Sequence, residues 1–328
     1  MLELTETKIR KWAAKINVEN LALAEQDIRL LEILKEIYSD KFLASHLYLK
    51  GGTAINKLYI EKTQRLSVDL DFNIVGDKET VFRNRNKIRD RILKLLEKSD
   101  PEYKIKFRSA YEATHIRAQY KPLFGEPLQH IKIELSTVER FPILEPTSRR
   151  LSSHDGKIVN VSTYQLEELT ATKLRALYGR LKGRDVYDLY HISSKELNKV
   201  LVRKLLLYYL YRERIIFEPK KFFESIKKKF KAKDYVDDLS YFIRATESFS
   251  MQKYIRHVIA FYSCLRELDK RDSDFILLAR YLLGRNIAKE IMGKIKSIEY
   301  PLRELFGKIR ISAQACNMRV DDIRIWKE

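Results

Sequence analysis

Residues 67–74 read SVDLDFNI, a run in which apolar and polar residues alternate. Leu70 and Phe72 occupy one set of alternate positions, and Asp69 and Asp71 occupy the other. Because successive side chains of a β-strand point to opposite faces, this period predicts a strand with one buried face and one acidic face. The chain is therefore expected to build a sheet that presents two carboxylates side by side.

The secondary structure predicted for the rest of the chain changes along its length. Further strands are predicted over residues 46–50, 103–109, 114–120 and 130–137. Helices are predicted over most of 1–45, over 80–98 and 165–180, and over nearly all that follows. The spacing of the last three strands favours antiparallel pairing. A mixed sheet followed by helices predicts an α+β fold, with one domain over 1–195 and a helical C-terminal domain over 196–328.

The formal net charge is +19, from 64 Lys and Arg against 45 Asp and Glu. A chain this basic is expected to meet a polyanion, and RNA is the first candidate. The alternative is that many of the lysines only cover solvated faces. Seven lysines between 220 and 233 surround Phe222, Phe223, Ile226 and Phe230. The apolar stripe predicts contact with the protein core. The lysines on the other side predict a surface that binds the phosphates of a nucleic acid.

Composition excludes several other classes of protein. Cys264 and Cys316 lack the spacing of a zinc site, and the six histidines are scattered. The N-terminal residues contain no apolar signal segment, and no stretch of 18 apolar residues could cross a membrane. We therefore expect a soluble cytoplasmic protein with no membrane partner.

The pair Asp69 and Asp71 is the first candidate for chemistry. Like charges this close raise each other's pKa unless a cation lies between them. A hard cation with oxygen ligands, Mg²⁺ or Mn²⁺, suits two carboxylates, and such ions also bind nucleoside triphosphates. The competing interpretation is a solvated outer strand face with no ligand.

A glycine-rich turn lies just upstream of this pair. Gly51 and Gly52 follow a predicted strand, and Thr53 is predicted to be the N-cap of a helix over 54–59. Glycines let a backbone approach a phosphate closely, and the positive end of a helix attracts it. Lys57 follows one turn later and could contact the same phosphates. An ordinary tight turn is the alternative.

A third charged group occupies the segment ELTATKLRALYGRLKGRDVYDLY. Asp185 and Asp188 are three residues apart and share a helix face, with Arg184 beside them to set their ionisation. Lys173 could supply a point charge to a triphosphate. The alternative is a ladder of surface ion pairs of little energetic value.

Four ordered motifs carry a family resemblance. LKGGTAINKLY, RLSVDLDF, the Lys173 helix and RDVYDL resemble the AbiEii/AbiGii nucleotidyltransferase toxins, which group with the MenT-type toxins in the polymerase-β-like nucleotidyltransferase superfamily. The resemblance covers about residues 45–195. It implies a polymerase-β-like nucleotidyltransferase core, a phosphate-binding turn formed by Gly51, Gly52 and Thr53, and metal binding by Asp69 and Asp71. It also implies that Lys173 contacts the NTP.

The resemblance extends to residues outside these pairs. One acid of RDVYDL is expected to assist the attacking hydroxyl, and we prefer Asp188 over Asp185. Arg65 and Ser67 match the family pattern and are expected either to contact the nucleotide or to brace the loop. Arg184 is expected near the nucleotide. Relatives carry a third metal carboxylate on a neighbouring strand, and Glu134 is placed to supply it. The alternative for Glu134 is an ion pair with Lys132 or Arg117.

The leading hypothesis is transfer of a nucleoside monophosphate from an NTP to an RNA hydroxyl, with Mg²⁺ and release of pyrophosphate. The resemblance implies the tRNA 3′ end as acceptor, a cognate antitoxin, and a role in a toxin–antitoxin or phage-defence (abortive infection) system. One alternative is a nucleotidyltransferase for a small molecule such as an antibiotic. The other is a non-catalytic nucleic-acid-binding module.

Overall fold

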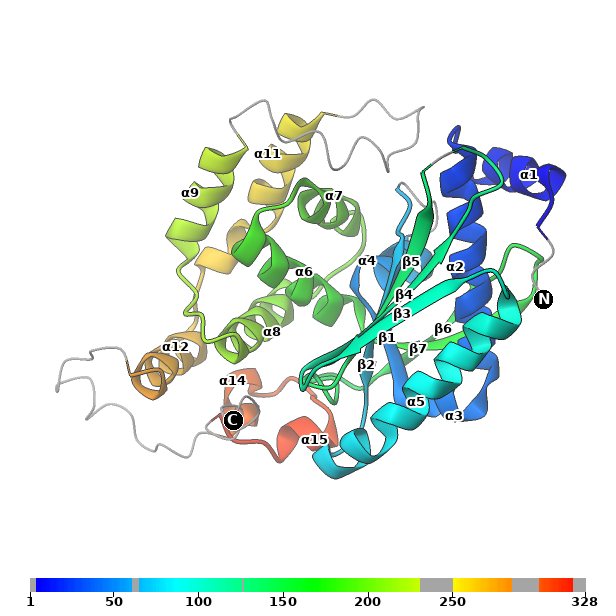
Figure 1. Cartoon of the computed structure of the whole chain (residues 1–328). Helices are drawn as coiled ribbons and strands as arrows, with labels where there is room; N and C mark the ends of the chain where they lie inside the picture. Colours follow the sequence, from blue (N-terminus) through cyan, green and yellow to red (C-terminus); the bar gives the residue numbers. More distant parts are fainter. Residues whose placement is uncertain (1–3, 61–64, 126, 231–249, 285–300, 321–328) are drawn as a thin grey trace. The chain divides into compact units, whose positions relative to one another are not determined.

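A computed structural model describes residues 4–60, 65–125, 127–230, 250–284 and 301–320 (Figure 1). The described residues form two compact units. The first comprises residues of 1–141 and 146–164, and the second comprises residues of 142–145 together with those after 164. The boundary predicted near residue 195 therefore falls within the second unit.

The first unit contains one sheet of seven strands among the described residues. The strands are β1 (Leu47–Lys50), β2 (Asp69–Ile74), β3 (Lys104–Ser109), β4 (Ala113–Tyr120), β5 (Gln129–Ser136), β6 (Thr147–Ser152) and β7 (Ile158–Thr163). Their order is β3-β4-β5-β2-β1-β7-β6. The predicted antiparallel pairing of β3, β4 and β5 is confirmed. The sheet is mixed because β2 runs parallel to β5 and β1 runs parallel to β7.

The first unit also contains helices. They are α1 (Glu6–Ile16), α2 (Leu21–Ser39), α3 (Lys41–His46), α4 (Gly51–Ala54), the π-helix η1 (Ile55–Tyr59) and α5 (Lys78–Ser99). The ring of Tyr38 on α2 lies 6.4 Å from that of Phe72, and Arg89 on α5 lies 4.9 Å from the Phe107 ring centroid. Phe72 and Phe107 belong to the same face, so α2 and α5 lie on one side of the sheet (Figure 1).

The second unit is built from helices. They are α6 (Leu166–Arg180), α7 (Gly183–Ile192), α8 (Lys199–Arg212), α9 (Pro219–Lys229), α11 (Met251–Phe261), the 3₁₀-helix η3 (Ser263–Arg266), α12 (Lys270–Leu282), α14 (Leu302–Phe306) and α15 (Ala313–Cys316). The α+β fold predicted from the sequence is confirmed by this combination of mixed sheet and helices.

The aromatic stripe of α9 packs as predicted. Phe222, Phe223, Ile226 and Phe230 are all buried, which confirms core contact. The last two lysines of that segment, Lys231 and Lys233, lie outside the described residues.

Strands β6 and β7 were not predicted. They form a hairpin whose turn contains Asp155 and Gly156, and Gly156 has a φ of +82°. An Asp-Gly pair between two short runs is a hairpin signal, and Val159 and Val161 alternate with polar residues. The signal was present, but exposed arginines in β6 masked its strand pattern.

Two predicted exclusions can be compared with the fold. Cys264 and Cys316 are both free thiols. In the parts of the chain that the structure describes, no helix is long and apolar enough to cross a membrane.

Candidate active site

The two carboxylates of β2 leave the same face of the strand. Asp69 and Asp71 are half-buried, whereas Leu70 and Phe72 on the other face are completely buried. This alternation confirms the predicted strand with one apolar and one acidic face. The period of the sequence therefore places the pair side by side, as a shared cation site requires.

Gly51 lies directly against Asp71. It follows β1, whose last residue, Lys50, pairs with Asp71 across the sheet. Gly51 has a φ of +73°, and a Cβ added there would overlap Asp71 Oδ2 and lie 3.1 Å from Asp71 Cγ. Only glycine combines this backbone conformation with so close an approach. The structure therefore brings the glycine turn and one carboxylate of the pair together.

Thr53 is not the N-cap of the following helix, so that prediction is wrong. Helix α4 begins at Gly51, its N-cap is Lys50, and no side chain caps it. Thr53 is fully buried, and its hydroxyl donates to the backbone carbonyl of Asp69 at 2.5 Å and lies 2.7 Å from Ser67 Oγ. Thr53 thus connects the glycine turn to the start of β2, and its predicted phosphate contact stays a prediction.

Lys57 is committed to an internal ion pair. Its Nζ lies 2.5 Å from Oδ1 of Asp27 on α2, and both side chains are almost fully buried. The other oxygen of Asp27 accepts a hydrogen bond of 3.1 Å from Trp12 Nε1. Asp27 neutralises this ammonium inside the first unit, and the predicted contact of Lys57 with a triphosphate stays a prediction.

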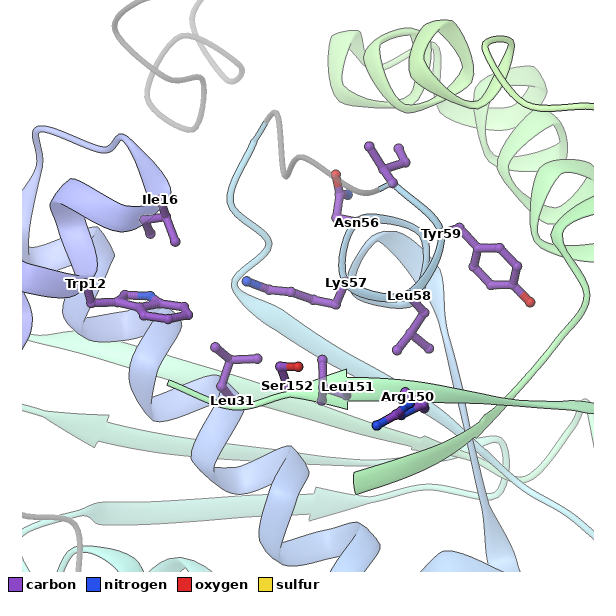
Figure 2. Close-up of a pocket in the computed structure, with 11 residues that line it drawn as sticks. Trp12, Ile16, Leu31, Asn56, Lys57, Leu58, Tyr59, Arg150, Leu151 and Ser152 are labelled. Atoms are coloured by element: carbon purple, nitrogen blue, oxygen red, sulfur yellow. The ribbon is translucent and has the colours of Figure 1, made fainter. Parts of the chain in front are cut away.

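Lys57 and Trp12 also line a pocket of about 270 Å³ in the first unit. Figure 2 shows the Lys57 side chain extending toward Trp12, with Leu31 and Ser152 beside them. Neither Asp69 nor Asp71 lines this pocket, so it is separate from the carboxylate pair.

Arg65 and Ser67 precede β2 and are both buried. One guanidinium nitrogen of Arg65 donates to the backbone carbonyl of Leu66 at 3.1 Å. Ser67 meets Thr53, as described above. These contacts support the loop that leads into the carboxylate strand, and the predicted nucleotide contacts of both residues stay predictions.

Glu134 lies on the strand next to the carboxylate pair. In the parallel ladder of β2 and β5, Glu134 is paired with Asp71, so its side chain leaves the same face. Its Oε2 lies 3.7 Å from His115 Nδ1 on β4, and its side chain is 39% exposed. The ion pair considered from the sequence was with Lys132 or Arg117, and the structure places His115 beside Glu134 instead.

The donor set of this face suits Mg²⁺. Within the described ranges, no three His, Cys, Asp or Glu side chains are close enough together to hold a metal ion. Mg²⁺ keeps several waters and commonly uses only one or two protein carboxylates together with phosphate oxygens. Asp69 and Asp71 provide such a pair, beside a glycine that leaves room next to Asp71. Glu134 as a third metal ligand stays a prediction.

The second unit holds the other predicted charged group. Lys173 Nζ on α6 lies 3.3 Å from Asp185 Oδ1 and 3.0 Å from Asp188 Oδ2 on α7. The side chains of both acids are fully buried, and that of Lys173 is 8% exposed. The three residues predicted to act together do meet. All three side chains are buried, whereas the alternative was a ladder of ion pairs on the surface.

Arg180, not Arg184, sets the ionisation of Asp185. The Arg180 guanidinium donates two hydrogen bonds of 2.8 Å, one to each oxygen of Asp185. Burial raises the pKa of Asp185, but the hydrogen bonds and charges of Arg180 and Lys173 outweigh it and hold that pKa below its ordinary value. The role assigned to Arg184 in this ionisation is therefore wrong, and its predicted nucleotide contact stays a prediction.

Asp27 and Arg180 are the partners that sequence reasoning missed. Asp27 lies thirty residues before Lys57, and Arg180 belongs to the helix before its acid. No local pattern marks either of them, because only helix packing brings each to its partner.

Comparison with known proteins places these features in a family. A model of the family described as nucleotidyl transferase AbiEii toxin, type IV toxin–antitoxin system, matches residues 32–261. No curated protein matches the chain. The MenT4 nucleotidyltransferase toxin of Mycobacterium tuberculosis is 19% identical, with a TM-score of 0.65 over 90% of this chain and 100% of that chain. JHP933 from Helicobacter pylori is 15% identical, with a TM-score of 0.46 over 81% and 94%.

The match to the family model includes the glycine turn, the carboxylate strand and the helices that carry Lys173 and its two acids. The likeness to MenT4 shows that the fold is shared. Both findings confirm the resemblance drawn from the four motifs. The family model covers well over half of the chain, and this protein therefore belongs to the AbiEii nucleotidyltransferase toxins of type IV toxin–antitoxin systems.

Proposed function

We propose that this nucleotidyltransferase moves a nucleoside monophosphate from an NTP to a hydroxyl group of RNA. The hydroxyl oxygen attacks the α-phosphorus, the bond from that phosphorus to the bridging oxygen of the β-phosphate breaks, and pyrophosphate leaves. The observation that carries the proposal is the pair Asp69 and Asp71 on one strand face, with Gly51 against Asp71. Two adjacent carboxylates beside a backbone cradle suit a triphosphate with its cation.

Asp69 and Asp71 would hold Mg²⁺ or Mn²⁺. Bound there, the ion would neutralise charge on the phosphate oxygens during the displacement. The backbone at Gly51 and Gly52 would lie along the triphosphate, since neither residue has a side chain to keep it away. Thr53 would contribute indirectly, by fixing the turn to the backbone of Asp69.

The proton of the acceptor hydroxyl needs a carboxylate within hydrogen-bonding reach. Glu134 is part-exposed and leaves the same face as Asp71, so we assign it this role. Asp185 and Asp188 were the sequence-based candidates. Both are buried against Lys173, and the lowered pKa of Asp185 makes it a weaker base. We therefore propose that these two acids position Lys173, which the family resemblance assigns to the NTP.

The acceptor is proposed from charge and family. The net charge of +19 favours a polyanionic acceptor over a neutral small molecule. The resemblance to MenT-type toxins adds the 3′ end of tRNA, whose blockage would stop translation. A cognate antitoxin follows from the type IV toxin–antitoxin family, and a role in abortive infection is part of the same proposal.

The test is incubation of the protein with each labelled NTP, Mg²⁺ and total tRNA. We expect label from at least one NTP at the tRNA 3′ end, and loss of that label in Asp69→Ala and after chelation of the metal. Asp90→Ala provides a matched control, because it removes an exposed aspartate of α5, the helix that packs on the opposite face of the sheet. Equal labelling by Asp69→Ala and wild type would refute the assignment of the carboxylates.

A small-molecule acceptor is the competing function. It predicts that labelled nucleotide appears in low-molecular-weight products and that RNA does not compete for transfer. Affinity for tRNA that falls steeply as salt increases would favour RNA, because phosphate contacts release counterions.

A further inference from the structure

A row of three cations crosses the sheet and ends at Asp69. In the ladders of the first unit, Lys106 on β3 pairs with Arg117 on β4, Arg117 pairs with Lys132 on β5, and Lys132 pairs with Asp69 on β2. Directly paired residues in a sheet leave the same face. The side chains of Lys106, Arg117 and Lys132, here called the cation row, therefore lie on the face that carries the candidate active site.

The cation row is accessible. Lys106, Arg117 and Lys132 are all exposed, whereas Ile116 and Ile133, their neighbours along the strands, are buried on the face that α2 and α5 cover. The row is a property of the strand alternation, because every second residue of β4 and β5 points away from the core.

No acid neutralises the cation row within the described part of the chain. Lys106 and Lys132 have no ion pair there, and the contact of Arg117 is with His130, Nη2 to Nδ1, at 3.2 Å. Like charges directly opposite each other in a sheet are destabilising. Burial lowers the pKa of His130, the charges of Arg117 and Lys132 lower it further, and the charge of Asp69 raises it. An external anion would relieve this repulsion.

The cation row is long enough to contact several phosphates of a nucleic-acid strand. Adjacent strands are about 4.8 Å apart, so the three steps from Lys106 to Asp69 span about 14 Å. Lys104 and Arg108 extend the positive charge along the outer strand β3, and both are exposed. Evenly spaced cations that lead to a carboxylate pair suit a chain of phosphates whose end reaches that pair.

We propose that the cation row binds the phosphate backbone of the RNA acceptor and guides its terminal hydroxyl to Asp69 and Asp71. This inference rests on the proposed nucleotidyl transfer and adds the surface that holds the acceptor. Lys132 would contact a phosphate close to the hydroxyl, Arg117 the next, and Lys106 the farthest. The contacts would be to phosphate, so binding would depend little on RNA sequence.

The test compares two full-length triple variants with the same change in charge. The row variant is Lys106→Gln, Arg117→Gln and Lys132→Gln. The control variant is Lys78→Gln, Lys94→Gln and Lys98→Gln, three exposed lysines of α5, the helix that packs on the opposite face. Binding of labelled tRNA is measured by fluorescence anisotropy at several salt concentrations, together with the KM for NTP and the thermal unfolding of each variant.

We expect the row variant to bind tRNA about 10- to 100-fold more weakly, and its slope of log affinity against log salt to be smaller by about 2. The control variant should stay within about twofold of wild type, and the KM for NTP should be unchanged in both. An acceptor oligonucleotide too short to reach β3 should respond to Lys132→Gln but not to Lys106→Gln.

Three outcomes would overturn the inference: equal tRNA binding by the row and control variants, a raised KM for NTP with unchanged tRNA binding, or no tRNA binding by wild type. The second outcome would assign the row to the triphosphate. If wild type bound tRNA but transferred nothing to it, the proposed function would fail. The comparison of the two variants would still decide whether the row binds RNA.

Discussion

The protein contains two pairs of aspartates in its candidate motifs, and the fold puts them in different environments. Asp69 and Asp71 are half-buried on a strand whose face carries exposed cations. Asp185 and Asp188 are fully buried and share the ammonium of Lys173. Both pairs belong to motifs that the family model matches.

The two environments allow each pair a different role. Half-buried carboxylates beside a glycine backbone can accept a cation and a triphosphate from solvent. Buried carboxylates already have a counter-charge, and breaking such a group leaves an uncompensated charge in the interior. The first pair should therefore control activity with little effect on stability, and the second should control stability as well. Four experiments test this contrast.

The largest effect is expected from Asp71→Asn. This change keeps the shape of the side chain but removes the charge, and should lower nucleotidyl transfer about a thousandfold, because charge stabilisation by a bound metal contributes several kcal/mol. The midpoint of thermal unfolding should move by less than about 2 °C. If the variant retained more than a tenth of wild-type activity, the assignment of Asp71 to the metal site would be wrong.

Lys173→Met tests the buried group. The variant keeps the apolar stem but removes the ammonium, which leaves two carboxylates that have lost one counter-charge. The free energy of unfolding should fall by about 3 kcal/mol, as measured by urea denaturation. Asp69→Ala, the matched change in the first unit, should alter it by less than about 0.5 kcal/mol. Similar losses in both variants would contradict the contrast.

Gly51→Ala should reduce transfer about a hundredfold, because the new methyl group would displace the carboxylate of Asp71. Gly156→Ala is the matched control, since Gly156 has a similar positive φ of +82° but nothing within 4 Å of an added Cβ. Both variants bear the backbone strain, and only the first also meets Asp71. Steady-state kinetics of the two variants separate strain from displacement, and equal activities would contradict the role of the glycine.

The smallest effect concerns acid stability. The pKa of Asp185 is lower in the folded protein than its ordinary value of 3.8, so the unfolded chain takes up that proton first as pH falls. The stabilisation is complete above pH 4 or so and is lost as pH falls through the folded pKa. Between pH 5 and pH 3, wild type should lose stability more steeply than Asp185→Asn, by at most about 1.4 kcal/mol per pH unit. Parallel curves from denaturation at each pH would refute this.

Local patterns predicted most of the secondary structure. The alternation around Leu70 and Phe72 located β2, and the apolar period of 165–180 located α6 within one residue. The hairpin of β6 and β7 was not predicted, because exposed arginines interrupt its pattern. The N-cap at Thr53 was also misplaced, since the φ of Gly51 allows the helix to begin three residues earlier.

The sequence by itself determined that Asp69 and Asp71 share a strand face and that a glycine turn precedes them, because both follow from spacing along one strand and one turn. Three relations are visible only in the folded chain: Asp27 neutralises Lys57, and Arg180 pairs with Asp185. The third is that Lys132 lies beside Asp69. Each of those relations joins segments that are distant in the chain or on different elements. They depend on helix packing and strand register, which no local period specifies.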